Sequence, residues 1–148
     1  MKRITLTLLV VLAALLTVPA ALAGNVHFVS ASAFINSQGS LVCKFRLAGF
    51  GSTQGQETTV SCSSTVTLGF TCGDGSTQGY TTSSTGFDSF GNYTGNSGGS
   101  VVSPPLITYP NPCLGTLHSV GYSDVAITDS SIGSKSAYSI PGTFTRSF

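Results

Sequence analysis

The sequence predicts an all-β fold, an antiparallel two-sheet sandwich of the immunoglobulin-like or another Greek-key type. Beyond the first 23 residues the chain has 23 serines and 16 threonines, together 39 residues, and all 18 of its glycines. Few of the helix-favouring residues Leu, Glu, Lys and Met remain, so the composition favours strands and turns. About seven to nine short alternating segments are separated by Gly-, Asn- and Pro-rich turns, which is typical of a sandwich.

The first 23 residues have the pattern of a bacterial secretory signal peptide. Lys2 and Arg3 precede an apolar run over 4–18, and the small residues Ala-Leu-Ala follow at 21–23. The run is shorter than the roughly 20 residues that span a membrane. We therefore expect cleavage after residue 23 and a single secreted domain over 24–148. That domain would be extracellular, or periplasmic in a Gram-negative bacterium, with no membrane insertion after cleavage.

The predicted mature domain carries few charges. It has four Lys and Arg residues against five Asp and Glu residues, which gives a net charge of −1. Such a chain has no basic patch for nucleic acid and no cationic amphipathic helix for a membrane surface. We expect no cofactor, and an extracellular glycan, peptide or protein surface is the expected kind of partner.

Two segments near the N-terminus alternate between apolar and polar residues in the way of half-buried strands. In 40–50 the apolar face includes Cys43, and in 57–70 it includes Cys62. Folding these segments into a hairpin about 51–54 places the two cysteines opposite each other on the apolar side. This register predicts a disulfide between Cys43 and Cys62.

The other two cysteines, Cys72 and Cys113, then pair by elimination and close a long Gly-, Ser- and Pro-rich segment. An even number of cysteines in an exported chain makes two disulfides the expected state. A metal site is the alternative, but no Cys-x-x-Cys pair is present, and neither His27 nor His118 has a suitable spacing to a cysteine. We predict no metal site.

Further strands are predicted along the rest of the chain, with a Gly-rich turn at 73–79. The segment 80–94 is expected to pair weakly with 100–109. Because Pro104 and Pro105 interrupt the second segment, it is predicted to be an edge or bulged strand. The remaining strands are expected at 25–35, 117–128 and 137–148.

Several short motifs occur in a characteristic order. They are Asn-Val-His-Phe at 25–28, Leu-Ala-Gly-Phe-Gly at 47–51, Thr-Cys at 71–72 and Pro-Asn-Pro-Cys at 110–113. In this order the chain resembles a group of small secreted bacterial all-β proteins without an assigned activity. The resemblance implies that the cysteines at 72 and 113 form the constant pair of the group. It supplies no catalytic residue.

The segment 95–99, Gly-Asn-Ser-Gly-Gly, matches the loop that carries the nucleophilic serine of trypsin-like proteases. His27, an aspartate at Asp74 or Asp88, and Ser97 occur in the order of that family. However, the match covers five residues, and a double β-barrel needs a far longer chain. We predict a turn-rich loop over 91–99 and no catalytic residue, with a serine hydrolase using Ser97 as an alternative.

An aromatic cluster with neighbouring carboxylate and amide groups is the candidate ligand-binding site. Such groups can hold a sugar or a peptide at the rim of a sandwich, although the same rings could instead form the local core. The predicted function is therefore a non-enzymatic, extracellular structural or surface-associated role with an unknown ligand. A carbohydrate- or peptide-binding module is the alternative. The candidate residues are Tyr80, Phe87, Asp88, Phe90, Asn92 and Tyr93.

Overall fold

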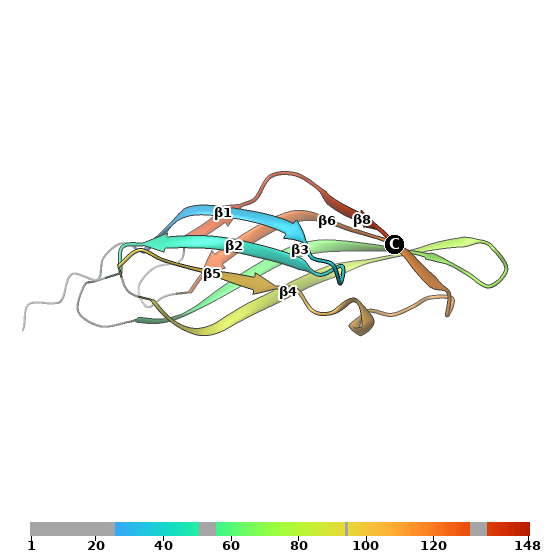
Figure 1. The fold of residues 1–148 in the computed structure, drawn as a ribbon, viewed down its shortest axis with the longest axis horizontal. Coiled ribbons are helices and arrows are strands. Elements are labelled where there is room, and N and C mark those ends of the chain that lie inside the picture. Colours follow the sequence, from blue (N-terminus) through green and yellow to red (C-terminus); the bar gives the residue numbers. More distant parts are fainter. Residues whose placement is uncertain (1–25, 51–55, 94, 131–135) are drawn as a thin grey trace, which may run out of the picture.

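A computed structural model describes residues 26–50, 56–93, 95–130 and 136–148. Two antiparallel sheets pack face to face, as Figure 1 shows. The predicted antiparallel two-sheet sandwich is therefore confirmed. The predicted signal peptide lies outside the described residues. Among the described residues, no helix is long and apolar enough to cross a membrane.

The strands divide between a small and a large sheet. Sheet A has the order β1-β2-β5, and sheet B has the order β4-β3-β6-β7, with β8 also paired to β6. The members of sheet A are β1 (His27–Ile35), β2 (Leu41–Ala48) and β5 (Ser97–Val102). The members of sheet B are β3 (Gln56–Thr71), β4 (Thr77–Tyr93), β6 (Thr116–Asp129), β7 (Ser136–Ser139) and β8 (Phe144–Ser147).

Alternation along the strands places the core between the sheets. In β2 the odd positions are buried, whereas Lys44 and Arg46 point to solvent. The even positions of β3 from Val60 to Phe70 are buried in the same way. Each such aliphatic or aromatic side chain contributes roughly 1.5–3 kcal/mol when it leaves water. The faces predicted from the period-2 pattern are thus confirmed.

The first disulfide joins the two sheets. Cys43 and Cys62 are bonded, with their Cα atoms 6.4 Å apart, so the predicted pair is confirmed. The predicted hairpin that motivated the pair is wrong, because β2 pairs with β1 and β5 while β3 pairs with β4 and β6. The two cysteines meet across the core and not across a ladder. A hairpin and two packed sheets both bring the apolar faces of these strands together. The disulfide could therefore be predicted correctly from a strand pairing that was wrong.

The hairpin of β3 and β4 is long and locally specified. Its turn is closed by Asp74, whose Oδ1 accepts hydrogen bonds from the backbone N–H of Ser76 at 2.9 Å and from its hydroxyl at 2.6 Å. Gly75 supplies the positive φ that the turn needs. The Gly-rich turn was predicted correctly. The predicted pairing of 80–94 with 100–109 is wrong, because β4 pairs with β3 in this local hairpin.

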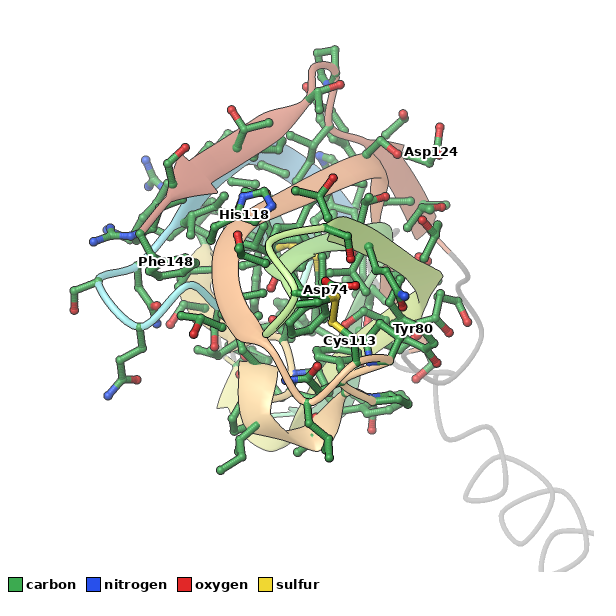
Figure 2. The ribbon with its side chains drawn as sticks, turned by 90° about the vertical axis from the view of Figure 1, so that its right-hand side faces the viewer. Asp74, Tyr80, Cys113, His118, Asp124 and Phe148 are labelled. Atoms are coloured by element: carbon green, nitrogen blue, oxygen red, sulfur yellow. A yellow bond between two sulfur atoms is a disulfide. The ribbon has the colours of Figure 1, made fainter. Side chains whose placement is uncertain are left out.

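A non-strand segment runs alongside the hairpin where it projects beyond sheet A in Figure 1. It runs over 103–115 and contains the short 3-10 helix η1 (Leu106–Thr108). Tyr109 packs against the core, and its hydroxyl is hydrogen bonded to that of Ser84 in β4. The bond between Cys72 and Cys113 fixes the far end, as predicted. Figure 2 looks onto this end and shows the disulfide beside the turn.

A bulge in β6 changes which residues face the core. Ser63 pairs with Ala126, but Thr65 pairs with Ser123, so β6 contains one extra residue at this point. Asp124 has φ +52 and is exposed, as Figure 2 shows. Aspartate tolerates this left-handed conformation better than most residues. The bulge explains why the buried positions are even before Asp124 and odd after it.

Candidate functional site

Tyr93, one of the predicted ligand-binding residues, is part of the core. It is only 6% exposed. Its ring lies 5.7 Å from that of Phe50 and 6.0 Å from that of Phe45, measured between centroids. The hydroxyl donates a hydrogen bond of 2.7 Å to Asp88 Oδ2. Tyr93 therefore closes one end of the sandwich and does not present its ring to a ligand.

The surroundings of Tyr93 keep its phenol neutral. Burial raises the pKa of Tyr93 first, and the hydrogen bond to Asp88 and the negative charges of Asp88 and Asp129 raise it further. The hydroxyl therefore remains a donor throughout the physiological range. Asp88 is the acceptor that this buried donor requires, which is a structural role.

The other predicted residues do not form one patch. Tyr80 is half-buried and packs against the core, on the inner side of β4. Phe87 points to the opposite side of β4 and is 65% exposed. The side chains of Phe90 and Asn92 lie outside the described part of the structure. Of the three described rings in the segment, Phe87 alone is largely open to solvent.

Ser97 lies in a strand. The loop predicted over 91–99 is therefore wrong for 91–93, which belong to β4, and for 97–99, which belong to β5. β5 begins at Ser97, which pairs with Leu47 of β2. His27 pairs with Ala48, the next residue of β2, and neighbouring residues of a strand point to opposite faces. Ser97 and His27 therefore lie on opposite faces of sheet A, an arrangement that does not form a serine–histidine pair.

The two glycines after Ser97 are required by packing. A Cβ at Gly98 would lie 2.7 Å from the carbonyl oxygen of Phe45. One at Gly99 would lie 2.9 Å from the Phe45 ring and 3.1 Å from the Tyr93 hydroxyl. Only glycine lets β5 approach β2 and these two rings so closely. The protease-like motif is thus explained by the core it packs against.

Serine and threonine side chains cover the outer face of sheet B, which we call the hydroxyl face. The sequence prediction missed it as a site, although its signal, Ser or Thr at most alternate positions of 61–71 and 77–85, was visible. Neighbouring strands align these groups: Thr65 pairs with Ser83 and Thr67 with Thr81, and the last two hydroxyls are 3.2 Å apart. The members are Ser61, Ser63, Thr65, Thr67, Thr71, Thr77, Thr81, Ser83, Thr85, Ser119, Ser123 and Thr145.

The hydroxyl face is almost free of charge. The segments 58–73 and 75–87, which form most of β3 and β4, contain no Asp, Glu, Lys or Arg. His118 lies over Gly69, with Cε1 2.7 Å from the position of an added Cβ. Figure 2 shows His118 on β6 near the hairpin end. The only exposed carboxylate that β6 contributes is Asp124 at the bulge. A charged ligand would find little electrostatic attraction here.

The chemistry available at this face is hydrogen bonding and apolar contact. Each hydroxyl can donate one hydrogen bond and accept two. Within the described residues, no three His, Cys, Asp or Glu side chains are grouped so that they could hold a metal ion. No protein-family model matches the chain, and a comparison with curated proteins finds no match.

Proposed function

We propose that this chain is an exported, non-catalytic protein that adheres to a neutral polysaccharide at the cell surface or in the extracellular matrix. The hydroxyl face of sheet B would be the contact surface. The proposal rests on one observation, that this face presents ordered rows of hydroxyls with no Asp, Glu, Lys or Arg over 58–73 and 75–87, which form most of β3 and β4. Neutral sugars carry the same groups, so each side can donate to and accept from the other.

Phe87 supports a glycan as the partner. Its ring lies on the hydroxyl face, opposite Ser61 and two residues from Thr85. An aromatic ring among hydroxyls suits a sugar, whose C–H groups pack on the ring while its hydroxyls make hydrogen bonds. Phe87 is thus the member of the predicted aromatic site that we keep as a ligand contact.

The covalent framework supports export. Two disulfides form where thiols can be oxidised, in extracellular or periplasmic space for a bacterial chain. The predicted signal peptide agrees with this location. A resemblance to small secreted bacterial β-proteins points the same way. We assign the protein to the extracellular space or periplasm of a bacterium.

The test is retention of the oxidised chain, purified after export, on insoluble cellulose and chitin, together with an array of neutral glycans. We expect retention on at least one neutral polymer and about tenfold weaker binding by Phe87→Ala, since partial burial of one phenylalanine ring contributes on the order of 1.5 kcal/mol. Phe34→Ala is the matched control, because Phe34 is 42% exposed on sheet A.

Three results would contradict the proposal, and two of them concern binding that is absent or unchanged. One is the absence of binding to every neutral polymer and glycan tested. The other is equal binding by Phe87→Ala and Phe34→Ala at the affinity of the wild-type chain. Loss of binding in both variants would also speak against the hydroxyl face, because Phe34 lies on the other sheet.

A further inference from the structure

A groove of about 310 Å³ crosses the outer face of sheet B where β6 runs between β3 and β8. Figure 1 shows β8 beside β6 near the C-terminus. The floor of the groove is Gly121, which pairs with Thr67 of β3 on one side and with Thr145 of β8 on the other. Ser119 and Ser123 lie two residues before and after Gly121 on the same face. A glycine is thus surrounded by four hydroxyl side chains.

Gly121 makes the groove hollow without being needed for packing. A Cβ built there would find its nearest atoms at 3.7 Å, on Thr145, and at 3.9 Å, the carbonyl oxygen of Thr67. These are ordinary van der Waals distances, and the φ of Gly121 is not in the left-handed region. A larger residue would fit the strand but would fill the floor. The empty space is therefore a property of this one position.

The groove favours a neutral ligand. Among the described residues that line the groove, Arg146 alone is charged. It pairs with the buried Val120, so its side chain lies on the other side of β8. Its Nη1 donates a 3.1 Å hydrogen bond to the carbonyl of Asn36, and its guanidinium lies 5.6 Å from the centroid of the Phe148 ring. Ser123 donates to Asp124, which leaves the Ser123 oxygen as an acceptor. The walls thus combine donors and acceptors, and the carboxylate of Asp124 beside Ser123 already accepts a hydrogen bond.

The size of the groove limits the ligand to one small unit. Cavities that hold small organic ligands begin at about 300 Å³, so this groove is at the lower limit. Neighbouring strands are about 4.8 Å apart, and alternate residues of one strand about 6.8 Å apart. Thr67 and Thr145 thus lie about 9.6 Å apart across Gly121, and Ser119 and Ser123 lie about 13.6 Å apart along β6, which leaves room for one sugar ring with a hydrogen bond on each side.

We propose that this groove is a subsite for a single neutral pyranose unit of the polysaccharide bound by the hydroxyl face. The inference rests on the proposed function and adds a defined position to it. Thr67, which forms one wall, lies six residues along β3 from Ser61, the partner of Phe87. That separation is roughly 20 Å, more than one sugar spans. A chain of several units is needed to contact the groove and Phe87 together.

The test compares two glycine substitutions on the same face. Gly121→Val fills the floor of the groove. Gly79→Val is the control, because a Cβ at Gly79 has its nearest neighbour at 3.8 Å and lies on β4, away from the groove. Affinity is measured by titration calorimetry with cello-, malto- and chito-oligosaccharides, from the single sugar to the longest soluble oligomer, and folding by thermal unfolding.

We expect Gly121→Val to lose at least about tenfold in affinity for the oligomer that the wild-type chain binds, while Gly79→Val, which lies on the same face outside the groove, loses much less. Affinity should also rise from the single sugar to the longer oligomers. If Gly121→Val fails to fold, Thr145→Val takes its place, since it removes one wall hydroxyl at nearly constant volume, and the same loss is expected.

The outcomes separate the two proposals. Binding by Gly121→Val at wild-type affinity, with loss of binding in Phe87→Ala, would overturn the proposed subsite in the groove. It would leave the hydroxyl face as the proposed contact surface. Equal losses in Gly121→Val and Gly79→Val would also overturn the groove as a specific subsite. If the wild-type chain binds no oligosaccharide or polymer, both proposals are wrong.

Discussion

Burial decides the role of individual residues in this chain. Tyr93 and Phe87 are six residues apart in one aromatic segment, yet one ring lies in the core and the other in solvent. Their odd numbers predict the same face of a regular strand. The register shift in the β3–β4 ladder between Thr58 and Thr59 breaks that regularity and turns Tyr93 inward. A bulge of this kind has no clear sequence signal, so the candidate site could be predicted only in part.

Because the pKa of Tyr93 is raised, the free energy of unfolding depends on pH in the alkaline range. In the unfolded chain a tyrosine ionises near pH 10, whereas in the folded chain Tyr93 stays protonated well above that pH. Its contribution is therefore complete below about pH 10 and is lost as the pH rises towards the folded pKa. We expect the free energy of unfolding to fall above about pH 10, and to fall less steeply in Tyr93→Phe.

The measurement is denaturant unfolding from about pH 8 to about pH 12, with tyrosinate absorbance recorded in parallel. Burial also raises the pKa of Tyr122, so the slope in Tyr93→Phe should decrease without vanishing. A slope that is identical in the wild type and Tyr93→Phe would show that Tyr93 ionises equally easily in both states.

At the scale of elements, the faces of strands were predictable and their partners were not. Alternation is local, so it correctly placed Leu41 and Leu47 inward and Lys44 outward. Pairing joins residues far apart, and the same apolar face suits either a hairpin or two packed sheets. The hydroxyl face was missed for a related reason. Ser and Thr at alternate positions also describe any strand with one side in water.

The disulfide of Cys72 and Cys113 holds the segment 103–115 against the hairpin. The two cysteines are separated by 41 residues in sequence. The chain-entropy relation then gives about 4 kcal/mol of stabilisation from the loss of freedom in the unfolded state. We expect the double variant Cys72→Ala/Cys113→Ala to lose about this much and to show faster amide hydrogen exchange over 103–115.

The matched comparison is Cys43→Ala/Cys62→Ala, whose cysteines are 19 residues apart. It should lose about 3 kcal/mol by the same relation, with faster exchange in β2 and β3. Exchange is measured by mass spectrometry on oxidised protein. If both double variants show the same pattern of exchange, the two bridges do not stabilise separate regions as described.

At the scale of the whole molecule, one edge strand of each sheet comes into close contact along one side of the sandwich. β4 is an edge of sheet B and β5 an edge of sheet A. They meet at Gly86, where an added Cβ would collide with the carbonyl oxygen of Val102. Glycine therefore lets the two edges cover each other. This contact shields the two edges around Gly86 and Val102 from pairing with another molecule.

A side chain at Gly86 should force the sheets apart. We expect Gly86→Val to lower the free energy of unfolding by about 1–3 kcal/mol, the usual effect of overpacking, and to promote self-association through the uncovered edges. Gly79→Val on the same strand is the control and should remain as stable and monomeric as the wild type, since its nearest neighbour lies 3.8 Å from an added Cβ. Urea unfolding and light scattering measure the two effects. A Gly86→Val variant with wild-type stability would mean that the carbonyl of Val102 can move away at no cost, so the edge contact would not determine the spacing of the sheets.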